Sequence, residues 1–334
     1  MSFIIRQAGI QTTVQDLGRP GWQHAGVPEG GAMDRVAHRI ANLLVGNPDG
    51  AAALECPLGS VALQFTAPAL VALAGRDIAA SLDGVTIPAW QPFRAETGAL
   101  LALHTGCRTS VAIAGGIDVP VVLGARGTSM RAGFGGFHGR ALRRDDILPI
   151  GEPTPLGKQM VSRLVEAGRM IADWGAGPAL RPSYAIQPTV RIIEGPELRW
   201  LTDASRERFF GASFRVAPES DRMGFRLQGP TLALTRSMEM LSAGVTVGTI
   251  QLPPGGAPIV LMADRQTTGG YPRLGDVIAY DLPLLAQLRP GDDVRFDTIA
   301  LDDAHTLYRH REHDLSRARH ALHLRFASSG HDAR

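Results

Sequence analysis

The chain has 334 residues, of which 44% are hydrophobic, and this length and composition predict a globular protein of one large or two medium domains. Its formal net charge of +2 is too small to favour nucleic acid or a membrane surface as the partner.

The lysine and cysteine content narrows the possible chemistry further. Lys158 is the only lysine, which excludes a P-loop lysine or a Schiff base over nearly all of the chain. Cys56 and Cys107 lack metal-ligand spacing, and we recognise no signal peptide, so we expect reduced thiols in a cytoplasmic protein. No apolar run reaches transmembrane length.

The first half of the chain is predicted to be mainly β. One helix is expected at about residues 34–45, where apolar residues recur at helical spacing, and Asp34 is interpreted as its N-cap in preference to a ligand. Asp83-Gly84 is a hairpin signal, and residues 126–140 are typical of a long glycine-rich loop. Short strands separated by turn signals indicate a barrel or sandwich. These strands are expected at residues 3–8, 61–65, 69–74, 99–103 and 110–114.

The second half is predicted to repeat this pattern after a join rich in proline and glycine. Helices are expected at residues 158–170 and 203–210, and the segment from Asp302 is interpreted as a surface helix ending in a frayed tail. The further strands are expected at residues 190–193, 214–216, 231–234, 246–252, 259–263 and 277–281. We therefore divide the chain into a first half at 1–150, the join at 151–188, a second half at 189–301 and a tail at 302–334.

One stretch, residues 258–272, concentrates the polar side chains that a site needs. Ile259 to Ala263 form an apolar run, which predicts a strand buried on both faces. Asp264, Arg265, Gln266, Thr267 and Thr268 follow without interruption before Gly269-Gly270. If the strand continues, Asp264, Gln266 and Thr268 share one face. Buried polar groups need partners from the protein or from a ligand.

Residues 12–21 and 220–229 have the same polar, glycine-punctuated character. Each stretch taken alone is explained by a tight turn with satisfied charges, whereas the three together favour a binding site. The sequence contains no P-loop, no G-x-S-x-G, no C-x-x-C and no biotin-accepting lysine motif. Such a site is therefore built from Arg, Asp, Gln, Thr and backbone amides, which bind carboxylates, phosphates and amide edges.

Several motifs together resemble one known family. Thr12-Thr13-Val14-Gln15-Asp16-Leu17-Gly18-Arg19-Pro20-Gly21, Asp221-Arg222-Met223-Gly224-Phe225-Arg226-Leu227, Gly248-Thr249-Ile250-Gln251-Leu252-Pro253 and Asp264-Arg265-Gln266-Thr267-Thr268-Gly269-Gly270-Tyr271-Pro272 occur in the order found in the family of the 5-oxoprolinase C component. This family is also known as allophanate hydrolase subunit 2 or biotin-dependent carboxyltransferase family. It includes Kip-type antagonists and the carboxyltransferase region of urea carboxylase. The resemblance covers roughly residues 3 to 300, with one departure, Phe225, where the family usually has Tyr.

The resemblance implies a mainly β fold of two tandem cyclophilin-like β-barrel domains with a few short helices. It also implies the B component of 5-oxoprolinase as an obligate partner and the A component as a further one, with a small amide substrate. The B and C components would use ATP, shared with the B component, to activate 5-oxoproline, and it is open whether Mg²⁺ takes part. In urea carboxylase the equivalent region transfers a carboxyl group to urea. That reaction would need other chains here, because no biotin is attached to this one.

The motif positions give the candidate site residues. Arg222 and Arg265 are assigned to substrate carboxylate or phosphoryl charge, Asp264 to orienting one of them, and Gln266 to catalysis beside the lactam edge. The expected substrate-binding residues are Asp16, Arg19, Asp221, Gln251, Thr267, Thr268 and Tyr271, and no metal site is expected. Two alternatives stay open: a carboxyltransferase-type or allophanate hydrolase-type subunit of an amide pathway, and a Kip-type regulatory binding protein without turnover.

Overall fold

The computed structural model describes residues 1–236 and 240–327. The chain forms two compact units that are not continuous in sequence. The N-terminal unit contains residues 1–18 and 34–182 and the chain from residue 312, whereas the C-terminal unit contains residues 19–33 and 183–311. The expected boundaries followed the order of the chain, whereas these units place residues 19–33 in the C-terminal unit and divide both the expected join at 151–188 and the expected tail at 302–334.

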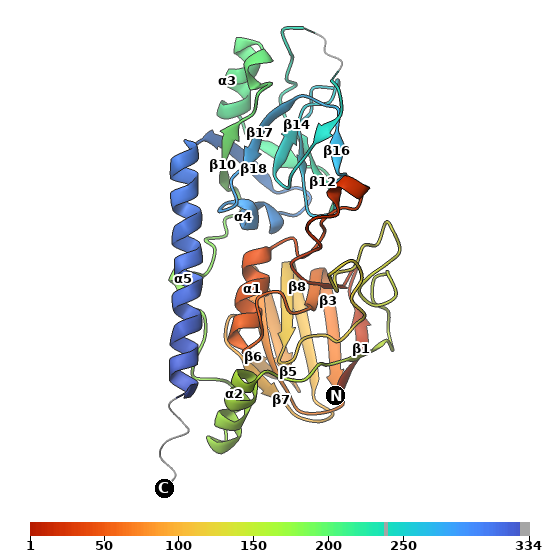
Figure 1. Cartoon of the computed structure of the whole chain (residues 1–334), viewed down its shortest axis with the longest axis vertical. Helices are drawn as coiled ribbons and strands as arrows, with labels where there is room; N and C mark the ends of the chain where they lie inside the picture. The colour runs from red at the N-terminus through yellow and green to blue at the C-terminus, as the bar shows by residue number, and fades with distance from the viewer. Residues whose placement is uncertain (237–239, 328–334) are drawn as a thin grey trace. The chain divides into compact units, whose positions relative to one another are not determined.

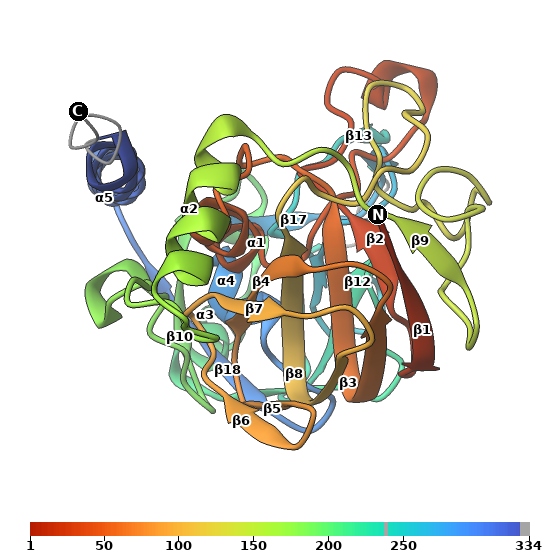
Figure 2. The ribbon, with the colours of Figure 1, turned by 90° about the horizontal axis from the view of Figure 1, so that it is seen from below.

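The N-terminal unit is built on a nine-stranded antiparallel sheet. Its main path is β6-β5-β8-β3-β1-β9, with β2 beside β3, β4 beside β8, and β7 beside β4; Figure 2 shows β8, β3 and β1 side by side. The two-barrel arrangement stays a prediction for this half. The strands are β1 (Ser2–Ala8), β2 (Thr13–Gln15), β3 (Ala53–Phe65), β4 (Ala69–Gly75), β5 (Ile78–Leu82), β6 (Val85–Ile87), β7 (Phe93–Ala95), β8 (Leu100–Ile113) and β9 (Ile147–Pro149).

Two strands of this sheet are longer than expected. Residues 99–103 and 110–114 were predicted as separate strands, but one strand, β8, runs through both, and it pairs with β3 from Leu100 to Val111. The prediction was wrong because the intervening Thr105 and Thr109 are polar, yet both are buried and hydrogen-bond each other at 2.9 Å. A satisfied polar pair can therefore continue a strand where apolar alternation is interrupted.

Two α-helices of the N-terminal unit begin with capping side chains. Asp34 accepts a hydrogen bond from the backbone N–H of Ala37 at 2.9 Å and so caps α1 (Arg35–Leu44), as predicted. Thr154 caps α2 (Pro155–Glu166), which begins at a proline three residues before the expected start. A 3₁₀ helix, η2 (Pro178–Leu180), lies near the end of the unit's central segment.

The C-terminal unit contains a closed seven-stranded barrel in the order β10-β17-β14-β15-β12-β11-β18 (Figure 1). A single apolar cluster that includes Ile250, Val260 and Phe296 forms its core. The strands are β10 (Thr189–Glu194), β11 (Phe214–Val216), β12 (Gly224–Gln228), β14 (Thr249–Gln251), β15 (Ile259–Leu261), β17 (Arg273–Val277) and β18 (Asp293–Thr298), and β13 (Ala243–Gly244) pairs with β16 (Thr268–Gly269) outside the barrel.

Two expected strands of this unit were misplaced. Residues 231–234 contribute only an isolated bridge between Leu201 and Leu234. The strand predicted at 277–281 lies earlier, since β17 ends at Val277 and the next helix begins at Leu282, with Pro283 in its first turn, a position that suits proline. The helices of the unit are η1 (Gln23–Ala25), η3 (Leu198–Trp200), α3 (Asp203–Gly211) and α4 (Leu282–Ala286).

The last element, α5 (Leu301–Ala327), is a helix of 27 residues, longer than the short helices that were expected. Residues up to Arg311 belong to the C-terminal unit, and those from Glu312 to the N-terminal unit. The tail expected at 302–334 was predicted to end in a frayed segment, and its last residues, 328–334, lie outside the described residues. Among the described residues, no helix combines the length and apolarity needed to cross a membrane.

Candidate functional site

The backbone hydrogen bonds between β12 and β15 continue beyond the ends of the two strands, into the polar stretch that follows β15. The Met262 N–H donates to the Met223 carbonyl at 2.9 Å, and the Asp264 N–H donates to the Arg222 carbonyl at 2.8 Å. The chain then turns, because the Arg265 N–H returns to the Met262 carbonyl at 3.2 Å. The buried strand was therefore predicted correctly, but its continuation, which would place Asp264, Gln266 and Thr268 on one face, was wrong.

This pairing brings Arg222 and Asp264 together as a two-point ion pair. Arg222 Nε lies 2.8 Å from Asp264 Oδ2, and Arg222 Nη2 lies 3.0 Å from Asp264 Oδ1. The side chains are only 7% and 19% exposed. Such a buried fork-to-fork pair holds both groups in one geometry. Arg222 Nη2 also donates to the Gly31 carbonyl at 2.7 Å, which extends the network to residues 19–33.

Residues 19–33, here called the crossing segment, pack against the barrel of the C-terminal unit although they precede the helix α1 of the other unit. Gln23 Nε2 donates to the carbonyls of Val245 and Thr267 at 3.0 and 2.8 Å. The Gly30 N–H donates to the Ala263 carbonyl at 3.2 Å. Figure 1 shows the segment in dark red beside β16. The C-terminal unit therefore includes a piece of the first half of the chain, which bonds to the loops around its closed barrel.

Arg265 and Arg19 also belong to this contact. Arg265 Nη2 lies 3.7 Å from Glu29 Oε2, and its Nε donates to the Val245 carbonyl at 3.3 Å. Arg19 is buried, and a β-carbon at Gly30, whose φ is +66°, would lie 3.5 Å from both Arg19 Nη1 and Asp264 Oδ1. The structure thus gathers four predicted site residues, Arg19, Arg222, Asp264 and Arg265, into one buried network at the crossing segment.

A groove of about 230 Å³ lies on the outer face of the same barrel. Gln251 on β14 is opposite Ile259 on β15, and Ile259 is opposite Arg226 on β12. These three residues form a row across adjacent strands, with their side chains on the face away from the core residues Ile250 and Val260. The full lining is Glu219, Asp221, Met223, Gly224, Arg226, Gln251, Ile259, Leu261, Gln266 and Tyr271.

Gln251 lines this groove, and in the part of the chain that the structure describes its buried side-chain amide has an unpaired donor, Nε2. Its side chain is 2% exposed, and within the described residues its Nε2 has no acceptor. Gln266 Nε2 donates to Gln251 Oε1 over a long 3.4 Å. Gly269 packs against the Gln251 amide so closely that a β-carbon there would overlap Nε2. A buried amide donor without a partner costs about 1–3 kcal/mol, which a ligand acceptor would recover.

The other predicted residues of this region do not all line the groove. Asp221 Oδ1 accepts from the N–H groups of Met223 and Gly224 at 2.8 and 3.2 Å, so the carboxylate at the groove also holds its turn. Tyr271 lines the groove and is exposed. Thr267 contributes its backbone carbonyl to Gln23 and Val245, and Thr268 is exposed in β16.

Two further motif residues, Phe225 and Asp16, make their contacts away from the groove, each inside its own unit. Phe225 lies in the barrel core, where a hydroxyl in its place would face apolar side chains and not the groove. Asp16 belongs to the N-terminal unit and accepts from the backbone N–H groups of Gly18 and Arg126, at 2.8 and 2.5 Å. Asp16 therefore fixes the start of the glycine-rich loop in its own unit.

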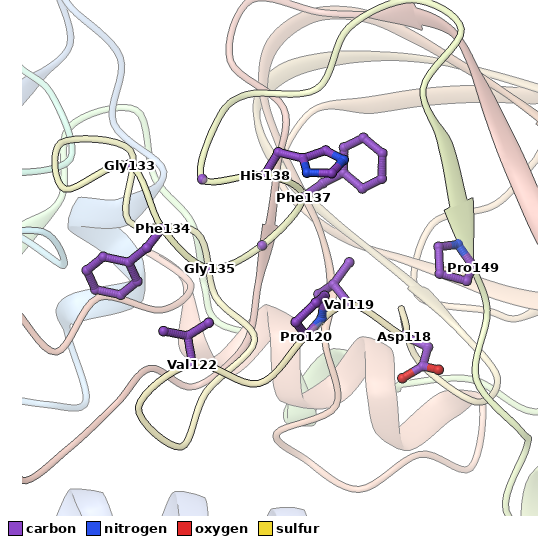
Figure 3. Close-up of a pocket in the computed structure, with 12 residues that line it drawn as sticks. Asp118, Val119, Pro120, Val122, Gly133, Phe134, Gly135, Phe137, His138 and Pro149 are labelled. Carbon is purple, nitrogen blue, oxygen red and sulfur yellow. The ribbon is translucent and has the colours of Figure 1, made fainter.

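That loop forms a second cavity, of about 420 Å³, which the sequence prediction missed. Figure 3 shows Phe137 beside His138, with Phe134 and Val122 on another wall. The rings of Phe137 and His138 are 4.4 Å apart and edge-to-face. His138 has a φ of +58°, which is unusual for a residue other than glycine. The run Gly133-Phe-Gly-Gly-Phe-His-Gly139 was the available signal, although it was interpreted only as a loop.

The chemistry of the groove is that of recognition. It presents carboxamides, one guanidinium and two carboxylates, a poor set for covalent catalysis. The same set does not fit a nucleoside triphosphate, whose charge needs several cations. Among residues 1–236 and 240–327, no group of three or more His, Cys, Asp or Glu side chains is placed to hold a metal ion.

Similarity to known proteins places this chain in a family. The C component of the Escherichia coli 5-oxoprolinase is 40% identical over 311 residues, which cover 91% of this chain and 93% of that protein. The C component of the Haemophilus influenzae 5-oxoprolinase is 33% identical and covers 90% and 93%. The Kluyveromyces lactis urea amidolyase structure superposes with a TM-score of 0.85 at 27% identity over 95% of this chain, which spans 20% of that enzyme. The model of the carboxyltransferase domain, subdomain A and B, matches residues 25–298, and the chain therefore belongs to this carboxyltransferase domain family.

Proposed function

We propose that this chain is the C component of a cytoplasmic, ATP-dependent 5-oxoprolinase complex that converts 5-oxo-L-proline to L-glutamate. The observation that carries the proposal is the 40% identity to the E. coli C component over 91% of this chain and 93% of the relative. That match spans nearly the full length of both proteins, so it extends over both units. The relative is named as a C subunit, which supports the presence of partner subunits, and in our proposal the B component is an obligate partner and the A component a further one.

The groove supports an amide as the substrate. A lactam presents a carbonyl acceptor and an N–H donor side by side, and a glutamine carboxamide presents the complementary pair. In our proposal Gln251 donates to the lactam carbonyl, and Gln266 accepts from the lactam N–H. The buried pairing of Arg222 with Asp264 supports a positioning role for both, because it fixes the turn that carries Gln266.

We assign no residue of this chain to ATP. The groove offers a triphosphate one guanidinium, Arg226, against two carboxylates, Glu219 and Asp221. Arg222 and Arg265 are already engaged with Asp264 and with Glu29. These features favour a nucleotide site supplied mainly by the B component.

A second candidate is a carboxyl transfer to urea or a related amide. It is favoured by the superposition on K. lactis urea carboxylase, with a TM-score of 0.85 over 95% of this chain, which spans 29% of that enzyme. Urea is planar and presents the same donor and acceptor edges as a lactam. The carboxyl donor would have to come from another chain, since Lys158, the only lysine, lies outside the groove.

Reconstitution tests the proposal. We expect the isolated chain to release no phosphate from ATP in response to 5-oxoproline, and its mixture with the A and B components to do so. Omitting this chain is the control for activity of the partners alone. Turnover by the isolated chain, or by the A and B components without it, would contradict the proposed role. A complex that is inactive with 5-oxoproline but transfers a carboxyl group to urea would favour the second candidate.

A further inference from the structure

Arg226 is a charged groove residue that the sequence prediction did not single out. It lies on β12, where side chains alternate between the core residues Phe225 and Leu227 and the outer face. Its hydrogen bonds to described residues are made by its backbone, with Ser220 and with Ala217. The exposed guanidinium is therefore available to a ligand in the groove.

Gln251 and Arg226 flank the groove from opposite sides. They lie on strands separated by β15, so their α-carbons are about 10 Å apart, twice the spacing of neighbouring strands. Ile259 forms the apolar floor between them, and Gly224 also lines the groove, packed so closely on Ile259 that a β-carbon there would lie 3.1 Å from Ile259 Cγ2. Arg226 is exposed on one flank of the groove, and the buried Gln251 lines the other flank.

We infer that this groove takes a small planar amide that carries a carboxylate, with Gln251 binding the amide and Arg226 binding the carboxylate. The inference rests on the proposed function and selects between its two candidates. 5-Oxoproline carries both groups, whereas urea carries only the amide and leaves the guanidinium without a partner. The volume of about 230 Å³ suits a single small ring better than a larger ligand.

Two carboxylates in the groove oppose the binding of an anion. Glu219 is exposed, and solvent and salt therefore screen its charge. Asp221 is committed through Oδ1 to the turn amides of Met223 and Gly224. A two-point guanidinium–carboxylate contact is directional and stronger than a screened repulsion. We therefore expect that removing the charge of Glu219 tightens the binding of the anion and that removing the charge of Arg226 weakens it.

The test compares four variants in the reconstituted complex. Arg226→Gln should raise the KM for 5-oxoproline about tenfold to hundredfold with little change in kcat, because a charged hydrogen bond to the substrate is lost. Inhibition by pyrrolidin-2-one, which has the lactam without the carboxylate, should stay as in the wild type. Gln251→Leu should weaken both compounds, and Glu219→Gln should lower the KM. The matched control is Arg295→Gln, an exposed arginine on β18 outside the groove.

An active complex in which Arg226→Gln leaves the KM unchanged would overturn the inference while the proposed function stands. A complex inactive with 5-oxoproline would overturn the proposed function. The groove is then tested by calorimetry with the full chain and three probes: 5-oxo-L-proline, pyrrolidin-2-one and L-proline. Binding of 5-oxo-L-proline that Arg226→Gln weakens would support the inference. Failure of the wild-type chain to bind 5-oxo-L-proline, or equal binding by Arg226→Gln, would overturn it.

Discussion

Replacing Arg222 by methionine tests whether the Arg222–Asp264 pair fixes the crossing segment. Methionine retains an apolar stem but removes both hydrogen bonds to Asp264 and the one to the Gly31 carbonyl. Removing one partner of a buried pair costs roughly 3–5 kcal/mol, because the remaining charge stays buried without compensation. Asp264 retains 19% exposure and lies near Arg19 across Gly30, so we expect the lower end, about 3 kcal/mol.

Thermal unfolding and hydrogen exchange measure this effect. A loss of about 3 kcal/mol should lower the Tm by about 6–12 °C for units of this size. Amide exchange in residues 19–33 should also accelerate, since Gly31 loses its donor and Gly30 is bonded to Ala263 beside it. The matched control is Arg206→Met, whose pair with Glu194 is 43% and 46% exposed and is worth at most about 1 kcal/mol.

A double variant tests whether the loss of stability comes from the uncompensated buried charge of Asp264. Arg222→Met combined with Asp264→Leu removes both charges and should recover much of the lost stability, because paired apolar replacements of a buried ion pair are often neutral. If Arg222→Met is no more destabilising than Arg206→Met, the pair does not stabilise the unit as we argue. If the double variant is as unstable as the sum of the two single variants, the loss does not come from an uncompensated charge.

Three further predictions concern the N-terminal unit. Gly136→Ala should lower stability by about 1–3 kcal/mol in thermal unfolding, because φ is +53° and a β-carbon would overlap the Thr128 hydroxyl, whereas Gly133→Ala has open space and should cost less. Burial lowers the pKa of His38 below its unfolded value of about 6.5, so stability should be fully present above pH 6.5 and fall by up to about 1.4 kcal/mol per pH unit below it; urea titrations against His38→Gln, which should flatten this slope, would check it. Burial raises the pKa of the Cys56 thiol to about 12, so iodoacetamide should label it only after unfolding, and rapid labelling of the native chain would contradict this.

Short stretches of sequence were enough to predict the elements that depend on neighbouring residues alone. The helix α1 and its cap at Asp34 follow from apolar spacing and from a side chain that bonds three residues ahead. The buried strand at Ile259 follows from an uninterrupted apolar run. The motif resemblance also identified residues that the structure gathers in one groove, namely Asp221, Gln251, Gln266 and Tyr271.

Other features depended on pairings between distant parts of the chain. The predicted alternation after Ala263 failed because the Arg265 N–H closes a turn to the Met262 carbonyl, a choice that composition does not reveal. Arg226 was missed because a lone arginine on a strand has no local signature, and only the pairing of both residues with Ile259 places it across β15 from Gln251. Pairing register is set by contacts far apart in sequence.

The crossing segment shows most clearly which features the sequence determined and which depended on the tertiary structure. The sequence by itself determined that residues 12–21 are polar and glycine-rich, that a helix starts after Asp34, and that the second half contains an apolar strand followed by charges. Only the tertiary structure decided that residues 19–33 belong to the C-terminal unit, where Gly31 meets Arg222 and Glu29 meets Arg265. The physical reason is that a buried charge requires a partner but does not specify where in the chain that partner lies, and the fold supplies it from about 190–240 residues away.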